Sequence, residues 1–156
     1  MQVGQRELRE VYAEPFAAAI REAGLATVMS SYSCVDGLPG SGSAELLTDL
    51  LRGELGFDGM VVADYFAVAL LAGYHRVAAD RAEAAIRAIT AGLDLELPAL
   101  DCFGEPLKAA LAAGRVPASA VDAAVRRVLI SKLRLGLFES PYVDPRGVRA
   151  VFERCV

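Results

Sequence analysis

The sequence predicts an α/β fold in which helices alternate with parallel strands. Segments with apolar residues at every third or fourth position, typical of helices, alternate with three short apolar runs, typical of strands. These runs are apolar at successive positions, as parallel strands covered by helices on both faces require. Right-handed crossovers join strands that alternate with helices in this way. With 156 residues, the chain is long enough for one domain with a hydrophobic core.

The first helix is expected in ELREVYAEPFAAAIREAG, residues 7–24. Its apolar positions recur at helical spacing: Leu8, Val11, Tyr12, Phe16, Ala19, Ile20 and Ala23. Pro15 suits a first helical turn, so we expect a new helical piece to begin there. Gly24 is expected to end it.

The second unit begins with a strand over residues 26–32 and a loop rich in Gly, Pro and Ser. Within this loop, Asp36 and Gly37 are expected to form a turn. Ser43 can cap the following helix, which Gly56 ends. The apolar face of that helix consists of leucines: Leu46, Leu47, Leu50, Leu51 and Leu55.

The second strand is predicted over residues 57–63, and a long connection over residues 64–79 follows it. Asp80 and Glu83 have the spacing of a capping box, which predicts the start of a helix. A third strand follows over residues 93–97.

Two helices and a tail complete the chain. Pro106 begins a short helix that ends at Gly114. Ser119 and Asp122 begin a longer helix. The tail is expected to leave the domain as a linker.

Polar residues mark the carboxyl end of each predicted strand. Tyr32, Asp64 and Glu96 hold equivalent positions on three consecutive strands. Because function in parallel α/β folds lies at this end of the strands, we expect a site here. Three strands also leave two open edges, and a closed parallel barrel needs eight. The chain is therefore either a small open sheet or part of a larger fold.

Composition excludes several classes of function. The net charge is −4 and no basic stripe occurs, which argues against a nucleic-acid partner. The longest apolar stretches are shorter than a membrane span. The cysteines, Cys34, Cys102 and Cys155, have no CxxC spacing and are expected to be thiols in a reducing compartment. With His75 as the single histidine, no metal site is expected.

Four segments carry motifs of one enzyme family, in that family's order. VMSSYSCVDGLPG matches a Met-x-x-Tyr-Asn-x-x-x-Gly-x-Pro loop, and GFDGMVVADYFAV matches Gly-Phe-x-Gly before a strand that ends Ser-Asp-Trp or Ser-Asp-Tyr. AGLDLELP resembles the next strand, and RVPASAVDAAVRRVLISKLRLGLFESPYVDP resembles a helix that leaves the barrel. From Leu8 to Pro145 the chain thus resembles family 3 glycoside hydrolases, which include β-glucosidases and β-xylosidases.

The resemblance implies that residues 1–140 form the C-terminal part of a catalytic (β/α)8 (TIM) barrel. This part would hold about three βα units and a C-terminal helix, and residues 141–156 would begin an interdomain linker. The complete enzyme would be a retaining β-glycosidase that hydrolyses terminal β-linked glucose or xylose from oligosaccharides or glycosides. Neither a metal nor an organic cofactor is implied.

The resemblance also assigns roles to residues at the strand ends. Asp64 corresponds to the catalytic nucleophile, and Tyr65 with the ring after it offers apolar surface to a sugar. Tyr32 is expected to line the substrate site, with Met29 behind it, packed toward the core and kept as a candidate for substrate binding. Glu96 either hydrogen-bonds a sugar hydroxyl or pairs with an arginine, and it is not the acid/base.

Some of the family's pattern is changed or absent. Ala63 replaces the usual Ser before the nucleophile, and Ser33 replaces an Asn, but neither change removes the carboxylate. The family's Lys-His pair and its sugar-binding Arg and Asp lie on earlier strands, and its acid/base Glu lies in a second domain. These missing strands and the second domain are the expected partners, and the isolated chain is expected to have little or no activity.

Three charged residues are expected to be structural. Asp94 is interpreted as a strand residue, and Arg52 as a surface or ion-pair residue. Arg127 and the charges near it on the last helix are interpreted as a solvated face.

Two other interpretations stay open. The chain could be a non-catalytic α/β half-barrel module that assembles with a partner chain through its open edges, or a truncated gene product without activity. The N-terminal segment has no apolar signal core, which favours a cytoplasmic location, although a reading frame that starts upstream of Met1 also stays open.

Overall fold

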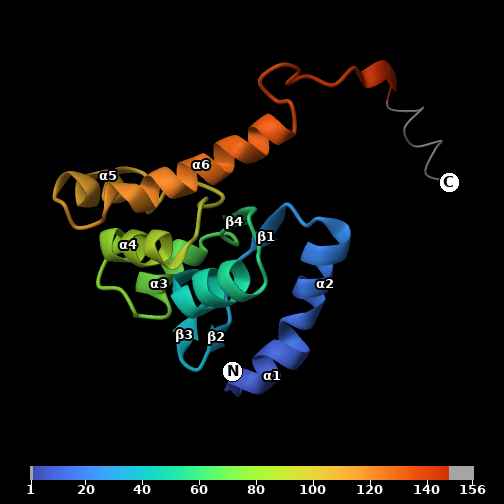
Figure 1. The fold of residues 1–156 in the computed structure, drawn as a ribbon. Coiled ribbons are helices and arrows are strands. Elements are labelled where there is room, and N and C mark those ends of the chain that lie inside the picture. Colours follow the sequence, from blue (N-terminus) through green and yellow to red (C-terminus); the bar gives the residue numbers. More distant parts are fainter. Residues whose placement is uncertain (1, 148–156) are drawn as a thin grey trace.

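The computed structural model describes residues 2–147 of the chain (Figure 1). In chain order, its elements are α1 (Gln5–Glu7), η1 (Leu8–Tyr12), α2 (Glu14–Ala23), β1 (Thr27–Met29), β2 (Cys34–Val35), β3 (Leu38–Pro39), η2 (Gly40–Gly42), η3 (Glu45–Glu54), β4 (Met60–Val62), α3 (Ala67–Gly73), α4 (Arg81–Ala91), α5 (Glu105–Ala112), α6 (Ala118–Arg134) and η4 (Pro145–Gly147).

Strands β1 and β4 pair in parallel at the centre of the molecule (Figure 1). Val28 lies opposite Val61, and a single parallel bridge between Val62 and Leu95 continues the order to the third predicted strand. The parallel arrangement of these segments is as predicted. The predicted third strand is reduced to that bridge, because its backbone pairs with β4 over a short stretch only.

The first two helical segments follow the predicted pattern with local differences. Pro15 lies in the first turn of α2, and Gly24 ends that helix with a φ of 60°, as expected. Helix η3 crosses from β1 to β4 and buries its leucine face, and the Ser43 Oγ accepts a hydrogen bond from the Leu46 N–H at 3.2 Å. The loop before it contains the small hairpin of β2 and β3, turned by Asp36 and Gly37.

The predicted connection over residues 64–79 is wrong in one respect, because it contains helix α3. The segment AVALLAG has no capping side chain and no polar face, so its helical period is hidden in the sequence. Val68 and Leu71 are fully buried there and belong to the hydrophobic core, and α3 packs against α4.

Helix α4 starts at the predicted capping box. The Glu83 N–H donates to Asp80 Oδ1 at 2.8 Å, and Glu83 Oε2 accepts from the Ala79 N–H at 2.8 Å. Helix α6 begins after Pro117 rather than at Ser119. Helices α4, α5 and α6 lie together beside the strands, and within residues 2–147 no helix is long and apolar enough to span a membrane (Figure 1).

Candidate active site

Asp64 lies directly after β4, on the turn that leads into α3. Backbone hydrogen bonds hold this turn on both sides: the Ala63 N–H donates to the Leu95 carbonyl at 2.8 Å, and the Phe66 N–H donates to the Leu97 carbonyl at 2.9 Å. The half-buried carboxylate of Asp64 accepts the Tyr65 N–H at 2.7 Å through Oδ1. The side chain thus has a fixed orientation at the carboxyl end of the sheet.

Phe66 gives this turn an uncommon backbone conformation. Its φ is 62°, in the left-handed region that a bulky aromatic residue rarely adopts. Such strain persists only where the surrounding structure imposes it, and it is concentrated at functional sites. Here the hydrogen bond from Phe66 to the Leu97 carbonyl holds the residue in place.

Tyr32 reaches the Asp64 turn from the loop after β1. Its hydroxyl donates to the Tyr65 carbonyl at 2.6 Å. Desolvation, followed by the interaction with the nearby carboxylate of Asp64, raises the pKa of Tyr32 above its usual value. The phenol therefore keeps its proton at neutral pH and joins the first two strand ends.

Aromatic rings are exposed around the carboxylate. Tyr65 is 55 % exposed and Phe66 is 50 % exposed. A sugar has apolar C–H faces and polar hydroxyl groups. Aromatic rings can contact the first kind of surface and a carboxylate the second. Met29 is expected to pack toward the core and instead is exposed, because side chains alternate along β1 and it is Val28 that faces the core.

Glu96 is buried at the end of the third strand segment. Both of its carboxylate oxygens accept the Cys102 N–H at 2.9 Å, and Oε2 also accepts the Phe103 N–H at 2.7 Å. The pairing with an arginine considered for Glu96 is not found among the described residues, where backbone amides take that place. Its contact with a sugar hydroxyl stays a prediction.

The thiol next to Glu96 makes stability depend on pH. Burial, and then the charge of Glu96, raises the pKa of Cys102 from 9.0 to about 12. The folded state therefore favours the neutral thiol, so this stabilisation is complete below pH 9 and is lost as the pH rises toward 12. We expect chemical denaturation to show a loss of stability over this range that Cys102→Ala reduces and Cys34→Ala does not. Equal pH profiles for Cys102→Ala and the wild type would contradict this.

Beneath the strands, Asp94 joins two arginines from different helices. Its side chain is fully buried and forms ion pairs with Arg52 of η3 at 2.8 Å and with Arg127 of α6 at 2.7 Å. It also accepts the Val61 N–H at 2.9 Å. The structural role of Asp94 and the ion pair of Arg52 are as predicted, but the solvated position predicted for Arg127 is wrong. Nothing local in the sequence indicates this contact, because 33 positions separate Arg127 from Asp94.

Arg52 is a largely buried arginine that bonds to several segments. Its guanidinium also donates to the carbonyls of Gly59 and Gly92, and burial lowers its pKa although Asp94 acts in the opposite direction. The residue therefore connects η3 to the segments that begin β4 and end α4.

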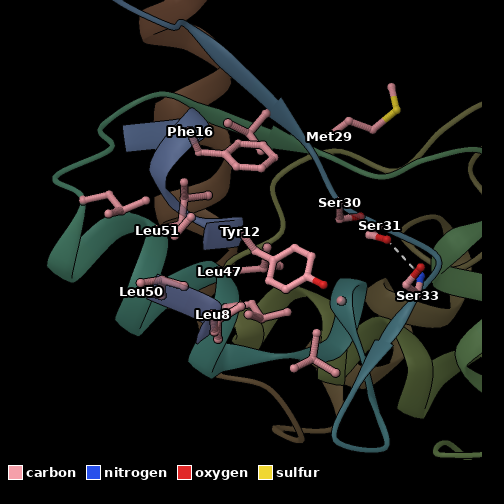
Figure 2. Close-up of a pocket in the computed structure, with 16 residues that line it drawn as sticks. Leu8, Tyr12, Phe16, Met29, Ser30, Ser31, Ser33, Leu47, Leu50 and Leu51 are labelled. Atoms are coloured by element: carbon pink, nitrogen blue, oxygen red, sulfur yellow. Dashed lines mark hydrogen bonds between the residues drawn. The ribbon is translucent and has the colours of Figure 1, made fainter. Parts of the chain in front are cut away.

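An apolar groove of about 330 Å³ lies between β1 and the helices η1, α2 and η3 (Figure 2). The rings of Tyr12 and Phe16 and the leucines of η3 face it, with Met29 at its edge (Figure 2). Asp64 does not line this groove, so it is distinct from the strand-end site. Within residues 2–147, no group of three or more His, Cys, Asp or Glu side chains could hold a metal ion.

Comparisons with known proteins agree on one family. The family described as "Glycosyl hydrolase family 3 N terminal domain" matches residues 1–130. The chain is 40 % identical to a lysosomal β-glucosidase of Dictyostelium discoideum over 146 residues, which cover 93 % of this chain and 18 % of that protein. It is 38 % identical to a β-xylosidase of Formosa agariphila, and that match covers 88 % of this chain and 20 % of that protein.

A solved structure gives the same result. The crystal structure of a β-glucosidase from Listeria innocua aligns with a TM-score of 0.86 at 39 % identity, over 91 % of this chain and 19 % of that one. The chain thus spans about one-fifth of the length of the proteins that it matches. It is a member of glycoside hydrolase family 3, and its residues 1–130 match the N-terminal domain of that family.

Proposed function

We propose that this chain supplies the nucleophile-bearing part of a retaining β-glycosidase that acts on terminal β-linked glucose or xylose. The observation that carries this proposal is Asp64, a half-buried carboxylate held at the end of β4 between exposed rings. The names of the relatives support the substrate class, since they are β-glucosidases and a β-xylosidase. The Listeria innocua enzyme is also described in complexes with glucose and with laminaribiose.

In the proposed reaction, Asp64 attacks the anomeric carbon as the bond from that carbon to the leaving oxygen breaks. A second carboxyl group, outside this chain, protonates the leaving oxygen. It then activates the water that hydrolyses the glycosyl ester on Asp64. The Tyr65 N–H, which donates to Asp64 Oδ1, helps to orient the carboxylate for the attack.

The complete fold is proposed to be an eight-stranded barrel to which this chain contributes three strand positions. Helices α1 to α2 precede β1 with no strand before them in residues 2–147. A strand that preceded these helices in the complete fold would lie beside β1, on the edge opposite β4, because crossovers between parallel strands are right-handed. There it would cover the apolar groove, including Tyr12, Phe16 and Met29.

The isolated 156-residue chain is expected to show little or no turnover. It lacks the proposed acid/base carboxyl and most of the sugar-binding residues, so little transition-state stabilisation remains. The measurement is release of nitrophenol from aryl β-glucoside and β-xyloside by purified protein, with Asp64→Asn as the control for contaminating enzymes. Clear turnover that Asp64→Asn abolishes would contradict the expectation.

A second candidate is a non-catalytic half-barrel module that assembles with a partner chain. The apolar groove beside β1 favours it, together with the edge of β1 that has no partner strand in residues 2–147, because exposed edges and apolar surface promote association. Light scattering distinguishes the two cases: a defined oligomer, or solubility only with a second chain, favours the module, and a stable monomer argues against it.

A further inference from the structure

We propose that Glu96 is a positioning residue that fixes the backbone on which Asp64 is carried. This inference rests on the proposed function of Asp64 as a nucleophile. It gives Glu96 a role different from direct contact with a sugar, and the role is defined by contacts within the chain.

Two backbone hydrogen bonds form a clamp around Asp64. The carbonyls of Leu95 and Leu97 accept the N–H groups of Ala63 and Phe66 at 2.8 and 2.9 Å. Asp64 lies between the two donors, so the position of its Cα follows the position of the segment over residues 95–97. The strained backbone of Phe66 would relax if the Leu97 carbonyl moved away.

Glu96 lies between the two residues whose carbonyls form the clamp. The residue is 4 % exposed, and its carboxylate accepts two backbone N–H groups from the loop that leads to α5. Cys102, the first donor, is fully buried in the core. Glu96 therefore anchors the clamp segment to the core at the point where its pairing with β4 ends.

The anchor needs a carboxylate at position 96. The donors from Cys102 and Phe103 together use both oxygens of Glu96. Glutamine has one acceptor oxygen, and its NH2 group would face a backbone donor. Glu96→Gln therefore keeps the size of the side chain, but with the amide oxygen at the position of Oε2 its NH2 group replaces Oε1 and faces the Cys102 N–H, donor against donor, which weakens the anchor.

The first test is amide hydrogen exchange of the 156-residue chain, measured by NMR. Exchange at Ala63 and Phe66 is compared with exchange at Val61, the core amide bound by Asp94, so that a uniform loss of stability cancels. Glu83→Gln is the matched control, because its carboxylate also accepts a backbone N–H but belongs to the cap of α4.

We expect Glu96→Gln to accelerate exchange at Ala63 and Phe66 by about tenfold or more relative to Val61, because local opening no longer requires the anchor to break. The ratio should be unchanged in Glu83→Gln. An unchanged ratio in Glu96→Gln would overturn the inference.

The second test measures the chemistry in a grafted enzyme, in which residues 1–140 of this chain replace the matching segment of the Listeria innocua β-glucosidase. An activated 2-deoxy-2-fluoro-glucoside forms a glycosyl ester on the nucleophile and releases its leaving group. We expect Glu96→Gln to lower the maximal rate of this step by about 10- to 100-fold, since small displacements of reacting groups are costly, with little change in the half-saturating concentration.

Two failures can be told apart in this experiment. If the unsubstituted graft is labelled at a residue other than Asp64, the proposed function is wrong whatever Glu96 does. If Asp64 is labelled and Glu96→Gln reacts at the same rate as Glu83→Gln, the proposed function stands and the inference is overturned.

Discussion

Asp64→Gly in the grafted enzyme is expected to lower kcat by about 10⁴-fold or more, as loss of a covalent nucleophile does in other enzymes. The loss follows from chemistry rather than folding, because Asp64 is half-buried and its side chain accepts one backbone N–H. Steady-state hydrolysis of an aryl β-glucoside measures it. Asp58→Asn is the surface control and should keep the activity of the graft, since Asp58 is exposed and pairs with Arg134.

An external anion should restore part of the activity of Asp64→Gly. Azide can occupy the space left by the carboxylate and attack the anomeric carbon, which would give an α-glycosyl azide instead of a hydrolysed sugar. The product is identified by NMR. No rescue in Asp64→Gly, together with equal residual activity in Asp64→Asn and the unsubstituted graft, would contradict the role of Asp64.

Asp94→Asn is expected to lower the free energy of unfolding of the chain by about 3–5 kcal/mol, the usual cost of breaking a buried ion pair. The substitution removes the charge that compensates the guanidinium groups of both Arg52 and Arg127, whose side chains are only 15 % and 24 % exposed. This loss is a large share of the stability of an ordinary domain. Urea denaturation followed by circular dichroism at neutral pH measures it.

The control for Asp94 is again Asp58→Asn. The Asp58–Arg134 pair is largely exposed, so its loss should cost less than about 1 kcal/mol. A similar small effect for Asp94→Asn would show that solvent screens the buried pair far more than its geometry suggests.

The sequence predicts the order of the elements well where local signals are strong. The capping box of Asp80 and Glu83 starts α4 as its chemistry requires. Pro15 lies in the first turn of α2, and Gly24 ends that helix. Asp64 and Tyr32 come together as expected, because the carboxyl ends of parallel strands share one edge of the sheet.

The remaining features depend on contacts between distant segments. Helix α3 is apolar on all sides, so its period is invisible in the sequence. The pairing of Arg127 with Asp94 and the backbone partners of Glu96 follow from the packing of α6 and of the loop before α5. Met29 is exposed because β1 turns Val28 toward the core and Met29 to the opposite face, and an apolar strand of three residues does not indicate which face is covered.

The most direct measurement is mass spectrometry of the grafted enzyme after inactivation with the activated fluoro-glucoside. Proteolysis should give one modified peptide, with the mass of the fluoro-sugar located on Asp64, since that carboxylate lies at the end of β4 and accepts the N–H of Tyr65, whose carbonyl accepts the hydroxyl of Tyr32. A fluoro-sugar attached to any other residue would contradict the assignment of Asp64 as the nucleophile.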